Sequence, residues 1–325
     1  MTREFYVNDA GNQINKFGAS LSVRYLQLFE GEEKHPLPED CYQGMDILDH
    51  AREFAKLYGD KYVNAPEEER RKALVDYALP LNIAALERDL GRYRIHYDVW
   101  FRESVLHREG KVTAICEKLK ENGWAYEKEG ALWYNNIKMM IEKAEKAGKP
   151  LSEAEIAELK DDVLVRANGV PTYFAADIAY HYNKFAERGF HRVINIWGAD
   201  HHGHVARLKG AMDAVGLDGD KLDIVLMQLV RLMKDGQPYR MSKRSGRAVT
   251  LTDLLDDVPI DAARFFFNMR EPNATFDFDL DLAVQQSSEN PVYYVQYAHA
   301  RICSVLKLVM AEGLTDCLLY TSPSP

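Results

Sequence analysis

The chain has 325 residues, 46% of them hydrophobic and 28% charged, which is the composition of a folded globular protein. No apolar run approaches the length that crosses a bilayer, and the first residues carry no signal-peptide core, so we expect no membrane partner. The net charge of −9 counts against a uniformly basic nucleic-acid-binding protein, but binding depends on local faces. One basic segment contains Lys234, Arg240, Lys243, Arg244 and Arg247.

The cysteines indicate a reducing compartment. The four of them lie far apart and form no CxxC pair: Cys41, Cys116, Cys303 and Cys317. This spacing argues against a zinc ribbon or a disulfide framework and fits reduced thiols. We therefore expect a cytoplasmic protein.

Helical patterns dominate the first half of the chain. Apolar residues at helical spacing predict helices over residues 9–30, 47–58, a charged segment after Pro66, and 112–119. Alternating apolar residues predict a strand over residues 95–101. Glu129-Gly130 is typical of a hairpin turn, and Ser152 with Glu155 forms a capping-box pattern that opens a short helix.

Strands and helices alternate in the second half. The predicted strands cover residues 163–165, 192–197 and 224–232, and the predicted helices cover 172–188 and 203–215. Some of these strands are apolar on both faces, which predicts a parallel sheet covered by helices on both sides. Asp235-Gly236 turns the chain into a loop, and nearly everything from Leu251 onward reads as helical. The predicted fold class is α/β: a nucleotide-binding parallel-sheet core with a helical insertion, followed by an α-helical module.

Polar residues gather directly after the predicted strand at residues 192–197. Asp200, His201, His202 and His204 lie at the carboxyl end of this strand, where open parallel sheets bind ligands. Gly198 permits close backbone approach, and the following helix N-terminus favours an anion. Two other interpretations stay open: a metal site, because His and Asp are possible ligands, and ordinary helix capping.

Tyr173 and Asp177 are four residues apart on one predicted helix and therefore share a face. A carboxylate and a phenol on one face suit a planar cation, because aspartate binds a guanidinium through paired charge-assisted hydrogen bonds. From the spacing alone, an exposed aspartate and a core tyrosine remain the simpler interpretation.

Met241, Ser242 and Lys243 lie in a glycine-flanked basic loop after a strand. Such a loop can close over a triphosphate, with Lys243 neutralising the charge that develops as pyrophosphate leaves. The loop lacks the Walker pattern. For the tripeptide by itself, a solvated basic loop remains the simpler interpretation.

Taken together, these segments resemble one family. The RMSKRSG loop resembles the KMSKS signature of class I aminoacyl-tRNA synthetases. Three further segments resemble bacterial arginyl-tRNA synthetases: YVNDAGNQI, YFAADIAYHYNKFAERGFHRVINIWGADHHGHVARLKGAM and FDFDLDLAVQQSSENPVYYVQYAHARI. The resemblance runs from about residue 3 to residue 310 and is weakest between Tyr134 and Lys160.

This resemblance implies a Rossmann-type catalytic domain that activates L-arginine with ATP and Mg²⁺ and then transfers it to tRNA(Arg), in an enzyme that is a monomer when complete. The implied arginine contacts are Tyr173, Asp177, His201 and Glu103. The implied ATP contacts are Gly198, Asp200, His204 and Arg240, and the implied catalytic loop is Met241, Ser242 and Lys243. No metal-ligating residue of the protein is implied.

The resemblance also divides the chain. It implies a partial catalytic core over residues 1–255 with an insertion at about 30–165, and a helical stem over 256–290. It further implies the start of an α-helical anticodon-binding domain over 291–316 and a non-native tail over 317–325.

Two features depart from the family pattern. No HxGH motif precedes the YVNDAG segment, and the helical anticodon-binding domain that starts at Asn290-Pro291 extends for about one helix. We therefore expect an incomplete enzyme that cannot charge tRNA alone. The alternatives are a short non-catalytic paralogue that binds tRNA or nucleotide, and a different class I synthetase such as a cysteinyl enzyme. The lack of a zinc-like Cys/His set and the acidic candidate residues disfavour the cysteinyl enzyme.

Overall fold

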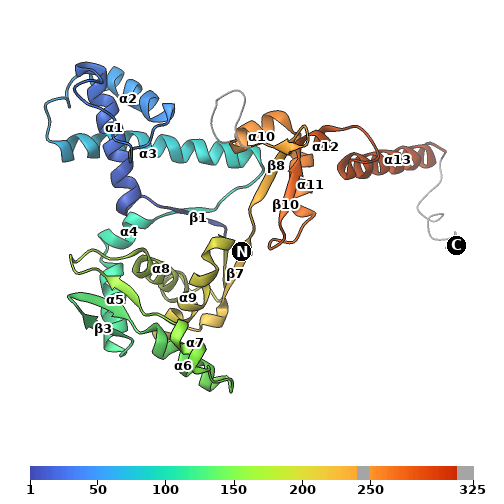
Figure 1. Cartoon of the computed structure of the whole chain (residues 1–325). Helices are drawn as coiled ribbons and strands as arrows, with labels where there is room; N and C mark the ends of the chain where they lie inside the picture. The colour runs from blue at the N-terminus through green and yellow to red at the C-terminus, as the bar shows by residue number, and fades with distance from the viewer. Residues whose placement is uncertain (240–248, 313–325) are drawn as a thin grey trace. The chain divides into compact units, whose positions relative to one another are not determined.

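The computed structural model describes residues 1–239 and 249–312, which divide into two compact units. Unit 1 comprises Met1–Leu90 and Ile95–Val225, and unit 2 comprises Gly91–Arg94 and the residues from Leu226 onward. Figure 1 follows the chain by colour. The predicted loop from Arg240 to Lys243 and the predicted tail lie outside the described residues. No helix in the described ranges is both long and apolar enough to cross a membrane.

Three long helices form one helical layer, drawn in blue and cyan in Figure 1: α1 (Gly11–Glu30), α2 (Met45–Tyr58) and α3 (Glu67–Arg92), of which α3 ends in unit 2. They form because their apolar residues recur every three to four positions and bury one face of each helix. Leu21, Phe54 and Leu74 are each 1% exposed or less and belong to the core that the three helices share. The helices predicted over residues 9–30 and 47–58 are confirmed.

Two pairs of strands take the place of the single parallel sheet that the sequence predicts. β1 (Glu4–Val7) runs parallel to β2 (Val99–Arg102), and β6 (Val193–Gly198) is paired with β7 (Leu222–Met227) in a separate sheet. α8 (Tyr173–Tyr182) and α9 (His202–Ala214) pack together in the main core, where Ile178, Leu208 and Met212 are fully buried. A π-helical turn (Asn183–Glu187) continues α8. The chain therefore has a mixed α/β fold.

A third sheet corrects the prediction for residues 163–165. β3 (Ala125–Lys128), β4 (Ala131–Tyr134) and β5 (Asp162–Val165) form an antiparallel sheet. The predicted strand exists, but its assignment to a parallel sheet is wrong, because β5 pairs antiparallel with β4. The predicted Glu129-Gly130 hairpin turn is confirmed, with φ of 54° and 75° at its two residues.

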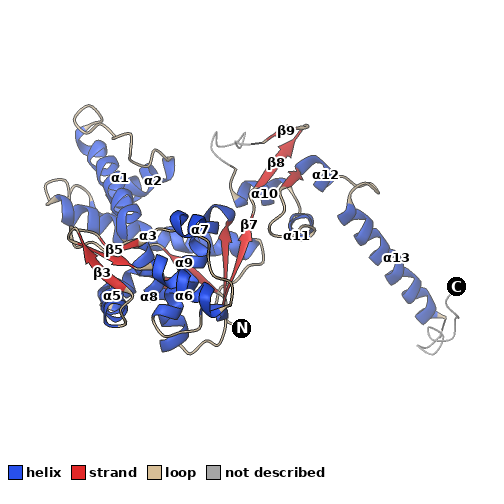
Figure 2. Ribbon diagram, turned by 60° about the horizontal axis from the view of Figure 1, so that its bottom comes forward, coloured by secondary structure: helices blue, strands red, loops and turns tan. Residues whose placement is uncertain are grey.

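Four shorter helices complete unit 1: α4 (Glu103–Arg108), α5 (Lys111–Glu121), α6 (Asn136–Lys146) and α7 (Glu153–Glu158). The capping box predicted at Ser152 and Glu155 is present at the start of α7. α5 packs on both β3 and α8, which joins the antiparallel sheet to the main core. Figure 2 separates the helices from the strands by colour.

Unit 2 has its own three-stranded sheet in the order β10 (Phe276–Asp279), β8 (Val230–Lys234) and β9 (Gln237–Pro238). Its helices are α10 (Leu251–Asp257), α11 (Ile260–Asn268), α12 (Leu280–Val284) and α13 (Pro291–Ala311). The single strand predicted over residues 224–232 is wrong, since β7 and β8 belong to different sheets. Gln228 lies between them and donates from its backbone to the Pro272 carbonyl at 2.8 Å. β10 is a strand within the part predicted as helical.

Candidate active site

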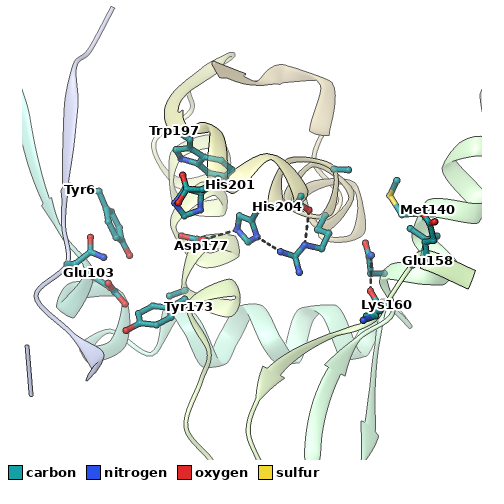
Figure 3. Close-up of a pocket in the computed structure, with 18 of the residues that line it drawn as sticks. Tyr6, Glu103, Met140, Glu158, Lys160, Tyr173, Asp177, Trp197, His201 and His204 are labelled. Carbon is teal, nitrogen blue, oxygen red and sulfur yellow. Dashed lines mark hydrogen bonds and ion pairs between the residues drawn. The ribbon is translucent and has the colours of Figure 1, made fainter. Parts of the chain in front are cut away.

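A cavity of about 980 Å³ opens in unit 1 (Figure 3). Its walls come from the end of β1, the start of α4, one face of α8 and the connection from β6 into α9. Six of the residues that the sequence predicts for the site line it together: Glu103, Tyr173, Asp177, Asp200, His201 and His204. Gly198 ends β6 next to this lining. Arg240, Met241, Ser242 and Lys243 lie outside the described residues.

Glu103 reaches the cavity because a second carboxylate holds the start of α4. Asp9 Oδ1 accepts a hydrogen bond from the Ser104 backbone N–H, and Asp9 Oδ2 accepts one from the Ser104 hydroxyl, both at 2.8 Å. Glu103 itself is 2% exposed. Burial raises the pKa of Glu103 above its usual range, and His107, 3.4 Å away, opposes this shift. The carboxylate therefore favours any cationic group that enters beside it.

Tyr6, at the end of β1, lies beside Glu103 in the cavity lining. Burial first, and then the charges of Glu103 and Asp177, raise the pKa of Tyr6, so the phenol stays protonated. The Tyr6 ring packs against Tyr180 with centroids 4.5 Å apart. Tyr6 therefore offers a neutral hydroxyl beside the Glu103 carboxylate.

Tyr173 and Asp177 project from one face of α8, as their spacing predicts. Thr172 caps this helix and accepts a hydrogen bond from the Ala175 backbone N–H. Tyr173 is 50% exposed, so the interpretation as a core tyrosine is wrong. Figure 3 shows Glu103, Tyr173 and Asp177 at one end of the cavity. Two carboxylates from different helices therefore meet at that end.

A chain of polar contacts links Asp177 to α9 and β5. His204 Nε2 lies 3.0 Å from Asp177 Oδ2, and His204 Nδ1 lies 3.1 Å from Nη2 of Arg207. Arg207 in turn forms an ion pair with Asp162 at the start of β5. Burial raises the pKa of Asp162, and the Arg207 charge opposes this shift. The contacts couple three elements that are far apart in the sequence.

Asp200 and His201 form a short turn between β6 and α9, and both side chains are exposed. Gly203 in the first turn of α9 also lines the cavity, so the positive end of this helix faces the same space. Within residues 1–239 and 249–312, no group of three or more His, Cys, Asp or Glu side chains is placed to hold a metal ion. This geometry does not favour the metal interpretation of the histidine cluster.

Comparison with known proteins identifies the family of the chain. Residues 15–303 match the family model described as "tRNA synthetases class I (R), catalytic domain". The chain belongs to the arginyl-tRNA synthetase family. It is 55% identical to the arginine–tRNA ligase of Ruminiclostridium cellulolyticum over 314 residues and 56% identical to that of Caldanaerobacter subterraneus. These matches cover 97% of this chain but 53% and 52% of the relatives, so the chain spans about half of their length.

Solved structures in the synthetase family share the fold. One is a crystal structure of a protein from Campylobacter jejuni that is assigned as an arginyl-tRNA synthetase. It superposes on this chain with a TM-score of 0.83 at 33% sequence identity, and the match covers 99% of this chain and 66% of that chain. The Thermus thermophilus arginyl-tRNA synthetase superposes with a TM-score of 0.64 at 20% identity, over 94% of this chain and 57% of that chain. The second likeness is one of fold alone.

Several cavity residues of this synthetase-family chain escape the sequence analysis: Tyr6, Asn8, Gln13, Asn136, Lys160 and Arg207. The EFYV segment is rich in aromatic and β-branched residues, and a strand prediction there would have placed Tyr6 and Asn8 at its carboxyl end. The spacing of three between His204 and Arg207 on one helix would have paired them. Asn136 and Lys160 fall where the family resemblance is weakest, and no sequence signal identifies them.

Proposed function

We propose that this chain forms the arginine-binding and ATP-facing part of an arginine–tRNA ligase. The enzyme would activate L-arginine with ATP to arginyl-adenylate and transfer the arginyl group to tRNA(Arg). One observation carries the proposal: Glu103 on α4 and Asp177 on α8 line the same cavity in a chain of the arginyl-tRNA synthetase family. A guanidinium is planar and carries only donors, so two converging carboxylates suit it.

The arginine side chain binds at the end of the cavity that contains Glu103, Tyr173 and Asp177. His204 engages Oδ2 of Asp177, which leaves Oδ1 to accept from the guanidinium. The Glu103 carboxylate lines the same space beside the neutral hydroxyl of Tyr6. The exposed Tyr173 ring packs beside the substrate, and His201 lies next to its amino-acid backbone. Lysine lacks the planar fork that two carboxylates recognise, so arginine is preferred.

ATP binds toward the β6–α9 connection, with contacts from Gly198, Asp200, His204 and Arg240. A side chain at Gly198 would place a Cβ 2.5 Å from Asp200 Oδ1, so glycine keeps this backbone accessible. The N-terminus of α9 favours the phosphates, and Met241, Ser242 and Lys243 would supply the catalytic loop that the family resemblance implies. Mg²⁺ is held largely by nucleotide phosphates with one or two carboxylates, a role that fits the exposed Asp200.

The same proposal extends to the organisation of the chain. It takes the catalytic core as Rossmann-type, with the insertion and stem at the boundaries predicted above. It takes α13 (Pro291–Ala311) as the beginning of an anticodon-binding domain that contacts tRNA(Arg) in a monomeric enzyme. Asn290 opens α13 and accepts from the Val292 backbone N–H, which makes the start of this helix well defined.

ATP–pyrophosphate exchange tests the proposal in protein expressed from its complete coding sequence, with tRNA(Arg) present. We expect exchange with arginine and none with lysine or cysteine. Asp177→Asn should abolish it, whereas the surface control Asp60→Asn should leave it unchanged. Near-normal exchange in the Asp177 variant would remove that residue from the site. Arginine binding without any exchange would instead favour the non-catalytic paralogue.

A further inference from the structure

Three directed contacts hold the guanidinium of Arg207 in place. Nε donates to the Gly203 carbonyl at 3.1 Å, Nη1 forms the ion pair with Asp162, and Nη2 lies 3.1 Å from His204 Nδ1. The guanidinium carbon of Arg207, Cζ, lies 5.8 Å from the centroid of the Phe174 ring. The cation is therefore fixed by α9 itself, by β5 and by the histidine one turn before it.

The contact with Arg207 determines which nitrogen of His204 carries the hydrogen. A guanidinium has donors and no acceptor, so Nδ1 of His204 must accept. A neutral imidazole that accepts at Nδ1 carries its hydrogen on Nε2. This hydrogen points at Asp177 Oδ2, 3.0 Å away. His204 therefore orients the carboxylate as a neutral donor and leaves the negative charge of Asp177 for a ligand.

Packing prevents the His204 ring from turning to another partner. Its centroid lies 5.3 Å from that of Phe174 and 5.4 Å from that of Trp197, and its side chain is 16% exposed. With the ring plane fixed, a hydrogen on Nδ1 instead of Nε2 would aim a lone pair at Asp177 Oδ2. The carboxylate would then turn away from the position seen in Figure 3.

We propose that Arg207 is a positioning residue of the arginine site: through His204 it fixes the orientation of the Asp177 carboxylate. In this arrangement Asp162 holds Arg207 in place and keeps this internal guanidinium from occupying Asp177 instead of the substrate. The inference rests on the proposed function, because it assigns the oriented carboxylate to substrate arginine. Arg207 would act through His204 and would not touch the reacting atoms.

The first test reads the hydrogen position directly and needs no activity. ¹⁵N NMR of histidine-labelled protein, assigned by the loss of signals in His204→Gln, should show the Nε2–H form at His204. Arg207→Met should lose this pattern. Lys209→Met, which removes a cation from the same helix, should keep it. An unchanged His204 pattern in Arg207→Met would overturn the proposal.

The second test separates substrate binding from turnover. In pyrophosphate exchange, Arg207→Met should raise KM for arginine between about tenfold and a hundredfold, since small misplacements of a binding group cost this much. Arg207→Lys, which keeps a cation at this position, should recover part of the loss. If Arg207→Met does not fold, Asp162→Asn serves in both tests, because it releases the same guanidinium.

The two tests also distinguish this inference from the function on which it rests. Arginine-dependent exchange in the unmodified protein, together with an unchanged KM in folded Arg207→Met, would overturn the positioning role alone. A histidine pattern that depends on Arg207 in a protein without arginine-dependent exchange would contradict the ligase function and support the role of Arg207.

Discussion

Nδ2 of Asn195 lies 2.6 Å from Nε2 of His181 inside the main core. The other ring nitrogen, Nδ1, lies 2.7 Å from the backbone carbonyl of Asp177 and donates to it. His181 is therefore neutral, with its hydrogen on Nδ1, and it ties the backbone of the proposed arginine-binding residue to β6. Burial first, and then the charge of Lys184, lowers the pKa of His181 to about 4.

This histidine makes stability depend on pH. The unfolded chain takes up a proton near the ordinary pKa of 6.5, whereas the folded chain does so only near a pKa of about 4, so stability falls as the pH is lowered through this window. The expected loss is about 2 kcal/mol in the free energy of unfolding between pH 7 and pH 5. Urea unfolding followed by tryptophan fluorescence measures it. His181→Gln should remove this pH-dependent loss, whereas the exposed control His191→Gln should show the same loss as the unmodified protein. Equal losses in the unmodified protein and in both variants would contradict the assignment of the loss to His181.

Glu4 lies between two cations, the buried Lys184 and the partly exposed Arg188. It lies 2.7 Å from Arg188 and 3.9 Å from Lys184, and it accepts from the Tyr180 hydroxyl. Burial lowers the pKa of Lys184 to about 8, and Glu4 opposes this shift. Glu4→Gln should therefore destabilise the protein by about 3 kcal/mol, because it leaves buried charge uncompensated.

The matched control for Glu4→Gln is Glu53→Gln, which removes a carboxylate from an exposed ion pair with Lys56. We expect a loss below about 1 kcal/mol for this pair. Urea unfolding at pH 7 compares the two variants. Similar losses in both would show that the buried cluster contributes no more than a surface ion pair.

Glu103 should limit stability while it supports arginine binding. Burial raises its pKa above the ordinary 4.5, so the folded chain binds this proton more readily than the unfolded chain, and stability rises as the pH falls toward the ordinary carboxyl range. Glu103→Gln should therefore raise the thermal midpoint at pH 7. KM for arginine should rise at least about tenfold with the loss of a charge-assisted contact. The exposed variant Glu109→Gln is the control; a lower midpoint together with an unchanged KM would refute both roles.

Gly198→Ala tests the ATP side separately from the arginine side. Within 4 Å the added Cβ would meet only the far end of the Asp200 side chain, which is exposed and can move. The free energy of unfolding should therefore change by less than about 0.5 kcal/mol. KM for ATP should rise about tenfold, because the methyl group blocks close backbone approach. KM for arginine should stay constant. An unchanged KM for ATP would remove Gly198 from the nucleotide site.

The sequence by itself determined features whose cause is local. The apolar periodicity of residues 9–30 and 47–58 predicts α1 and α2 because a helix with one apolar face buries that face. Glu129-Gly130 predicts its hairpin because glycine readily adopts the positive φ that a tight turn requires. The spacing of four places Tyr173 and Asp177 on one face of α8, and the cavity confirms that they share it.

Only the tertiary structure decided which elements meet. The segment of residues 163–165 has the pattern of a strand, but its antiparallel partner β4 is selected by packing and not by its own residues. Glu103 becomes a buried acid because Asp9, 95 residues from Ser104, holds α4 in place. The hydrogen on His204 depends on Arg207 and Asp162, and hence on α9 reaching β5. The apolar periodicity of a segment shows that one of its faces is buried, but it does not show which element covers that face. The protonation states of the site residues depend on side chains that other elements bring to them, so the sequence pattern cannot predict them.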